Sequence, residues 1–136
     1  MLIILCGLIG SGKTTYAVEN YKHFTDLDYM PPNSSKTDQI KLTLSLLERL
    51  DEHDAVCHIT CYPTQEEIDA FRHINNKRFL WINASLNQAM ENIMTRKRLR
   101  DMQNLKRVYD RNRQYLRAFS YSPINFTSVN VYSGRG

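Results

Sequence analysis

The feature that most constrains the fold is an apolar run at the start of the chain that closely spaced glycines interrupt. Residues 2–6 are all apolar, and Gly7-Leu8-Ile9-Gly10-Ser11-Gly12-Lys13-Thr14 follows directly. A continuous apolar run is typical of a strand buried on both faces of a parallel sheet. Residues 13–21 then carry apolar side chains at helical spacing. The sequence therefore predicts a strand, a glycine-containing turn (the glycine loop, residues 7–14) and a helix.

The glycine loop has the spacing of a phosphate-binding loop. Glycines permit backbone conformations that wrap N–H groups around phosphates, and the positive end of the following helix adds to the attraction. Lys13 is expected to reach the β and γ phosphates, and the Thr14 hydroxyl to bind Mg²⁺. A chance glycine turn is the alternative, but every fixed position is present between the required strand and helix. The sequence predicts an ATP and Mg²⁺ site formed by Gly7, Gly10, Ser11, Gly12, Lys13, Thr14 and Thr15.

Strand and helix patterns alternate along the rest of the chain. Helices are predicted at 38–50, after a capping box at Thr64, and across 85–122, where the absence of Pro and Gly allows one long helix or two. This alternation predicts an α/β fold with a parallel five-stranded sheet flanked by helices. The length of 136 residues suits a single domain, 1–136. The further strands are predicted at 23–28, 55–60, 79–83 and 126–132.

Composition excludes several classes of protein. A hydrophobic content of 42% is far from that of a disordered chain. No run approaches the roughly 18 apolar residues that cross a bilayer, and the apolar start lacks a basic leader, so we expect a cytoplasmic protein without membrane contact. Cys6, Cys57 and Cys61 are expected to be reduced thiols, because they are odd in number and lie in or beside apolar runs. No second ligand pair follows Cys57 and Cys61 at zinc-site spacing, so a zinc site is not expected there.

The positive charge is concentrated in one segment. The chain has a formal charge of +4, and residues 96–117 hold nine basic residues against Asp101 and Asp110. Such a cluster suits a phosphate-rich partner, although charge runs are usually solvated helix faces. It could also follow a nucleic-acid backbone, with Tyr109, Tyr115 and Tyr121 stacking on bases, but tyrosines at helical spacing are more often packing residues.

The glycine loop and the segment Phe24-Thr25-Asp26-Leu27-Asp28 resemble those of the compact P-loop kinases, which include polynucleotide, shikimate and gluconate kinases and the zeta-toxin type. The resemblance covers nearly the whole chain in order of elements. It implies that Asp28, after the second strand, accepts the proton of the acceptor hydroxyl, and that Asp26 helps to hold Mg²⁺. The alternative is a simple turn, because Asp is common where strands end.

The same resemblance implies a lid whose arginines neutralise charge in the transition state. Arg96 is the nearest match to the lid arginine, with Arg98 and Arg100 as close alternatives, and Arg96 and Arg100 are the two we assign to the site. The lid glycine and proline of many members are absent between Arg96 and Leu105, which favours a minimal helical lid.

The remaining motifs narrow the function to a kinase. An Asn-Lys-x-Asp guanine-reading motif is absent, and the chain is short for a motor ATPase. The leading hypothesis is an ATP-dependent kinase acting on a nucleotide, a nucleoside or a polynucleotide 5′-end, with residues 31–38 and Tyr29 as the acceptor site. The third strand ends at Thr60 without the aspartate that many P-loop proteins use toward Mg²⁺. This absence fits an ATP-binding regulatory protein with slow or no hydrolysis, which is one alternative. A kinase of a small non-nucleotide metabolite is another, and the sequence does not give the oligomeric state.

Overall fold

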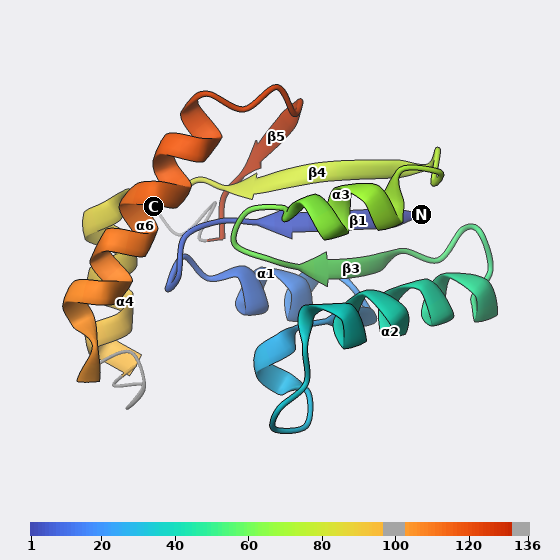
Figure 1. The fold of residues 1–136 in the computed structure, drawn as a ribbon, viewed down its shortest axis with the longest axis horizontal. Coiled ribbons are helices and arrows are strands. Elements are labelled where there is room, and N and C mark those ends of the chain that lie inside the picture. The colour runs from blue at the N-terminus through green and yellow to red at the C-terminus, as the bar shows by residue number, and fades with distance from the viewer. Residues whose placement is uncertain (97–102, 132–136) are drawn as a thin grey trace.

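The computed structural model describes residues 1–96 and 103–131, and it contains a five-stranded sheet in which every neighbouring pair of strands is parallel. The predicted parallel α/β architecture is confirmed. The central strand is β1, and every one of its residues is buried. In sheet order the strands are β2 (His23–Thr25), β3 (Val56–Ile59), β1 (Leu2–Cys6), β4 (Lys77–Ile82) and β5 (Phe126–Val129) (Figure 1).

Helices cover both faces of the sheet. Alternate side chains of β1 point to opposite faces, so Leu2 and Ile4 join one apolar cluster and Ile3 and Leu5 the other. The first cluster receives side chains from α2, α3, α4 and α6, and the second from α1. The helices are α1 (Lys13–Asn20), α2 (Lys36–Arg49), α3 (Gln65–Phe71), α4 (Leu86–Arg96) and α6 (Leu105–Ser120).

The region of the two aspartates differs from the prediction. The strand expected over residues 23–28 ends at Thr25, and a 3₁₀ turn, η1 (Leu27–Tyr29), follows it. The reason is local, because Asp26 Oδ1 accepts a hydrogen bond from the backbone N–H of Asp28, at 3.0 Å, and so caps the turn. Asp28 therefore lies in a turn beyond the strand.

Other boundaries moved by a few residues. Helix α2 begins at Lys36 because Ser35 and Asp38 form a capping box. The described part of residues 85–122 contains α4 and α6, and Asn104 is the non-helical N-cap of α6, so the segment is not one continuous helix. Strand β5 ends at Val129, and Tyr132, the last residue of the predicted strand, lies outside the described residues.

The topology opens a crevice at the carboxyl ends of β1 and β3. These strands are neighbours, yet α1 after β1 and α3 after β3 pack on opposite faces of the sheet. Ligands of open α/β sheets bind where the connections diverge in this way. In Figure 1 the arrowheads of β1, β3 and β4 point toward the side of the molecule on which α4 and α6 lie.

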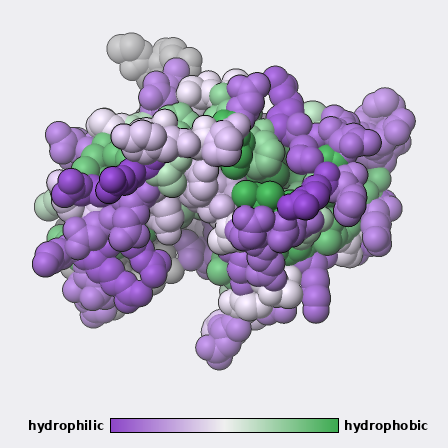
Figure 2. All heavy atoms as spheres, turned by 45° about the horizontal axis from the view of Figure 1, so that its top comes forward, coloured by the Kyte–Doolittle hydropathy of each residue, from purple (hydrophilic) through white to green (hydrophobic). Residues whose placement is uncertain are grey.

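The surface is mainly polar on the face seen in Figure 2, where hydrophilic side chains surround smaller groups of hydrophobic atoms. Within residues 1–96 and 103–131, no helix combines the length and the apolar character that a membrane span requires.

Candidate active site

The glycine loop has the conformation that its sequence predicts. Gly10 and Gly12 have φ angles of +85° and +99°, in the region that favours glycine. A Cβ atom on Gly10 would lie 2.6 Å from the carbonyl oxygen of Ala89, so the loop also packs too closely against α4 for any side chain there. Helix α1 starts at Lys13, and its first N–H groups, which have no partner within the helix, face the end of the loop. This is the arrangement that binds an anion.

Lys13 lies across the mouth of the loop. Its Nζ donates hydrogen bonds to the carbonyl oxygens of Gly7, at 2.9 Å, and Leu8, at 2.8 Å, and lies 3.6 Å from the Sγ of Cys61. These contacts fix the position of the ammonium group beside the crevice. The loop thus provides both neutral N–H donors and one full positive charge for a phosphate chain.

The predicted metal ligands are in direct contact. The Thr14 hydroxyl donates to Asp26 Oδ2 at 2.9 Å, and Asp26 is 8% exposed. Hard cations such as Mg²⁺ bind oxygen ligands, so this hydroxyl and this carboxylate form a fitting donor set. Among the described residues, no group of three or more His, Cys, Asp or Glu side chains could hold a metal.

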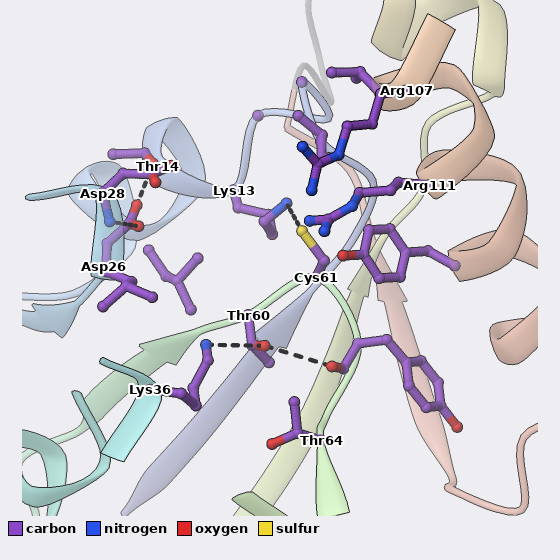
Figure 3. Close-up of a pocket in the computed structure, with 18 of the residues that line it drawn as sticks. Lys13, Thr14, Asp26, Asp28, Lys36, Thr60, Cys61, Thr64, Arg107 and Arg111 are labelled. Atoms are coloured by element: carbon purple, nitrogen blue, oxygen red, sulfur yellow. Dashed lines mark hydrogen bonds between the residues drawn. The ribbon is translucent and has the colours of Figure 1, made fainter. Parts of the chain in front are cut away.

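A cavity of about 530 Å³ joins the loop to the two aspartates (Figure 3). Asp26 and Asp28 line it, as do Lys36 and Thr60 on the side opposite Lys13. Helix α6 closes it with one face, from which Arg107, Val108, Arg111 and Tyr115 line the cavity together with the N-cap residue Asn104.

Sequence reasoning missed Arg107 and Arg111. Figure 3 shows both side chains reaching toward Lys13 from α6. Their spacing of four residues, continued by Tyr115, was a signal, since residues at that spacing share one face of a helix. Arg96, which the sequence predicted, also lines the cavity, and its Nη2 donates to the Thr15 hydroxyl at 3.4 Å. The predicted Arg100 and its alternative Arg98 lie outside the described residues.

The other predicted loop residues have different positions. Ser11 is buried, and its Oγ has no hydrogen-bond partner in the described part of the chain. Ser11 lines a second cavity, of about 330 Å³, and does not line the cavity at the aspartates. Tyr29, expected at the acceptor site, is 64% exposed and is not among the residues that line the main cavity. From the predicted acceptor segment 31–38, the lining residue is Lys36.

Two asparagines, one on α4 and one on α6, bond the tip of the loop, and neither was predicted. The buried amide of Asn112, on α6, accepts from the N–H of Ile9 at 2.7 Å and donates to the carbonyl oxygen of Ile9 at 3.0 Å. Asn92, on α4, donates to the carbonyl oxygen of Gly10 at 2.9 Å. The backbone of the loop is therefore bonded to the helices that carry the arginines.

A buried polar network lies beneath the other end of the cavity. Glu67, on α3, is 1% exposed, and its Oε2 lies 2.5 Å from Nε2 of the fully buried His58 and 3.4 Å from Nζ of Lys36. Glu67 Oε1 accepts from the hydroxyl of Thr60, the residue at the end of β3 where an aspartate was absent. The Thr60 side chain, at the position where many P-loop proteins have the aspartate, is thus part of this buried network.

Burial and pairing set the protonation of these groups. Burial lowers the pKa of His58 from its ordinary value of 6.5, so the imidazole is neutral near pH 7. Burial alone would raise the pKa of Glu67, but the hydrogen bond from His58 and the charge of Lys36 lower it to about 2. Glu67 is therefore a carboxylate, and Lys36 is the full positive charge beside it.

Comparison with known proteins adds evidence on the fold. The chain is similar to a deoxyadenosine kinase from M. mycoides with bound dATP, at a TM-score of 0.61 and 14% identity, over 96% of this chain and 91% of that one. The fold is that of the P-loop kinases. A gluconokinase from Sinorhizobium meliloti 1021 is also similar, at a TM-score of 0.52 and 15% identity, over 95% of this chain and 81% of that one. No protein-family model matches the sequence, and no curated protein matches it.

Proposed function

We propose that this chain is an ATP-dependent kinase that transfers the γ-phosphoryl group to a hydroxyl of a nucleotide, a nucleoside or a polynucleotide 5′-end. The strongest support for this proposal is the set of residues that line one cavity. It brings together a phosphate-binding loop with Lys13 and Thr14, the carboxylates of Asp26 and Asp28, and cationic side chains on the facing helices. Phosphoryl transfer depends mainly on positioning and charge neutralisation, and these groups supply both.

Thr14 and Asp26 would hold Mg²⁺, which would neutralise charge on the donor phosphates when bound. The loop N–H groups and Lys13 would hold the β and γ phosphates. Arg107 and Arg111 would neutralise the charge that develops on the transferred group, together with Arg96. Arg107 and Arg111 approach from α6, on the opposite side of the cavity from the two aspartates. The γ-phosphoryl group would lie between these arginines and the aspartates.

Asp28 would orient the acceptor hydroxyl. In the transfer, the hydroxyl oxygen forms a bond to the γ phosphorus, and the bond between that phosphorus and the bridging oxygen of ADP breaks. The hydroxyl proton passes to the carboxylate of Asp28. The bond from the Asp28 N–H to Asp26 fixes the backbone of the turn that carries this carboxylate.

The proposed class of acceptor is supported by a likeness of fold. One similar structure is the deoxyadenosine kinase in complex with dATP, and another holds the same enzyme with dCMP and dCDP. These favour a nucleoside or nucleotide acceptor here. The similarity to a gluconokinase makes a non-nucleotide hydroxyl compound the alternative within the kinase class.

An acceptor panel tests the proposal. The purified chain with ATP and Mg²⁺ is mixed in turn with deoxynucleosides, deoxynucleoside monophosphates, a 5′-hydroxyl oligonucleotide and gluconate, and ADP formation is measured. We expect ADP to form at least about tenfold faster with one class than without acceptor. A rate that no member of the panel raises would reject the kinase and favour the ATP-binding regulatory protein, for which the absence of an aspartate at Thr60 is the supporting observation.

Substitution Asp28→Asn tests the assigned base. We expect kcat with the active acceptor to fall by a factor of about 10² or more, because the amide cannot take the hydroxyl proton. The Kd for ATP should remain within about twofold, because the donor is held by the loop. Asp110→Asn, an exposed residue of α6, is the matched control and should leave both values unchanged. Full activity of the Asp28 variant would remove this residue from the mechanism.

A further inference from the structure

Lys36 differs in position from the other cations that line the cavity. Lys13, Arg96, Arg107 and Arg111 come from the loop, α4 and α6, whereas Lys36 is the first residue of α2. Figure 3 shows Lys36 and Thr64 across the cavity from Lys13 and Arg107. The donor phosphates at the loop would use the first group. The charge of Lys36 belongs to the acceptor end.

The ammonium group of Lys36 is fixed in place. Its Nζ donates to Gln39 Oε1 at 2.9 Å and to the Thr60 hydroxyl at 3.4 Å, and the side chain is 25% exposed. Gln39 is itself fully buried and donates to the carbonyl oxygens of Thr25 and Ile59. A charge that is already ordered binds a ligand without the entropy loss of ordering a flexible lysine.

The Glu67 carboxylate has hydrogen-bond partners other than Lys36. One Glu67 oxygen accepts from the Thr60 hydroxyl and from the N–H and hydroxyl of Thr64, and the other contacts His58. Lys36 therefore supplies charge at the cavity wall, 3.4 Å from the carboxylate.

We infer that Lys36 binds an anionic group carried by the acceptor, so that the substrate is a hydroxyl compound bearing a phosphate or a carboxylate. This inference rests on the proposed function, because it assigns the acceptor end of the same cavity. Lysine binds such groups as a point charge, and the partly enclosed cavity wall strengthens the pairing. Glu67, His58 and Thr60 act through Lys36 by fixing its position.

Binding without transfer tests the inference separately from turnover. The chain is saturated with a non-hydrolysable ATP analogue and Mg²⁺, and calorimetry measures binding of deoxyadenosine 3′-monophosphate against deoxyadenosine, and of gluconate against sorbitol. We expect the anionic member of one pair to bind at least about tenfold more tightly, and the pair that shows this identifies the phosphate or the carboxylate.

Lys36→Met should remove that advantage and leave the Kd for the uncharged member and for the ATP analogue within about twofold. Lys36→Arg should restore most of the advantage. Lys41→Met, an exposed lysine of the same helix, is the matched control and should retain it. Lys36→Gln removes the charge and keeps a partner for Gln39, and it replaces the Met variant if that variant does not fold.

Retention of the advantage in the charge-free variants would overturn the inference, and so would the absence of an advantage in both pairs. Equal weakening of the charged and uncharged members would show that Lys36 only supports Glu67, which also overturns it. A lack of phosphoryl transfer in the separate turnover assay would count against the proposed function alone, because these binding values do not depend on it.

Discussion

At the residue scale, the loop depends on backbone geometry that only glycine tolerates. Gly10 combines a positive φ with contact to α4, where an added Cβ would also lie 2.6 Å from a side-chain atom of Ile93. The loop can approach α4 this closely only without a side chain. The identity of this one residue therefore affects both the phosphate site and the packing of α4.

We predict that Gly10→Ala lowers the free energy of unfolding by about 1–3 kcal/mol, through backbone strain and the clash with Ala89. The Kd for ATP should rise by about tenfold or more, because the N–H groups no longer point at one centre. Urea unfolding and ATP titration measure the two effects. Asn33→Gly, at a surface residue that also has a positive φ of 69°, is the comparison and should change stability by less than about 1 kcal/mol. Wild-type ATP affinity in the Ala variant would contradict the assigned loop geometry.

At the element scale, α6 has two functions on adjacent faces. One face presents Arg107 and Arg111 to the cavity, and Asn112, the next residue along, bonds the tip of the loop. The arginines and the phosphate-binding backbone are thereby placed relative to each other by one rigid helix.

We expect Asn112→Leu to lower stability by about 1–3 kcal/mol, because the N–H and carbonyl of Ile9 lose their partners in a buried place. The Kd for ATP should rise by more than about fivefold, since the loop is no longer fixed against α6. Asn87→Leu, at an exposed residue of α4, should change neither value. Thermal unfolding and ATP titration give the measurements, and an unchanged ATP affinity in the Asn112 variant would show that the bonds to Ile9 do not serve the loop.

At the scale of the whole molecule, the polar network at the end of β3 joins α2, α3 and the sheet. Glu67 from α3 contacts Lys36 from α2 and His58 from β3, all beneath the cavity. The end of the cavity that Lys36 lines is therefore formed only when these three elements have packed together.

This network makes folding stability fall in acid. The pKa of His58 is below 6.5 in the folded chain, so the unfolded chain takes up a proton first as the pH falls below 6.5. Glu67 has a folded pKa of about 2 against an ordinary 4.5, so its contribution is present above pH 4.5 and is lost as the pH falls toward 2. Both effects lower the free energy of unfolding as the pH falls.

We predict that the urea midpoint falls steadily as the pH is lowered from about 6.5 to about 2, and that Glu67→Gln flattens the decline below about pH 5 while lowering stability at pH 7. Glu66→Gln, at the exposed neighbouring residue, should keep the wild-type profile. A Glu67→Gln profile parallel to wild type below pH 5 would mean that other groups cause the acid sensitivity.

The sequence by itself determined the local features: the first strand, the glycine loop, the helix after it, and the alternation that gives a parallel sheet. These could be predicted because each depends on neighbouring residues, as with the positive φ at Gly10 and Gly12. The contact of Thr14 with Asp26 was foreseen only as two residues with a shared metal role. The turn at Asp28 was foreseen only as an alternative to the strand end, because the bond that caps it is made by a side chain.

Only the tertiary structure decided which distant residues share the cavity. Arg107 and Arg111 meet Lys13 because the order of the strands places α6 across the carboxyl ends of β1 and β3, and Lys36 joins them from α2. In the sequence, Arg107 and Arg111 are two of the nine basic residues between 96 and 117, and residue type alone does not separate them from the others. The physical reason is that packing against the whole sheet determines which face of a helix is buried. That packing, and not the neighbouring residues in the chain, therefore determines which side chains the helix presents to the cavity.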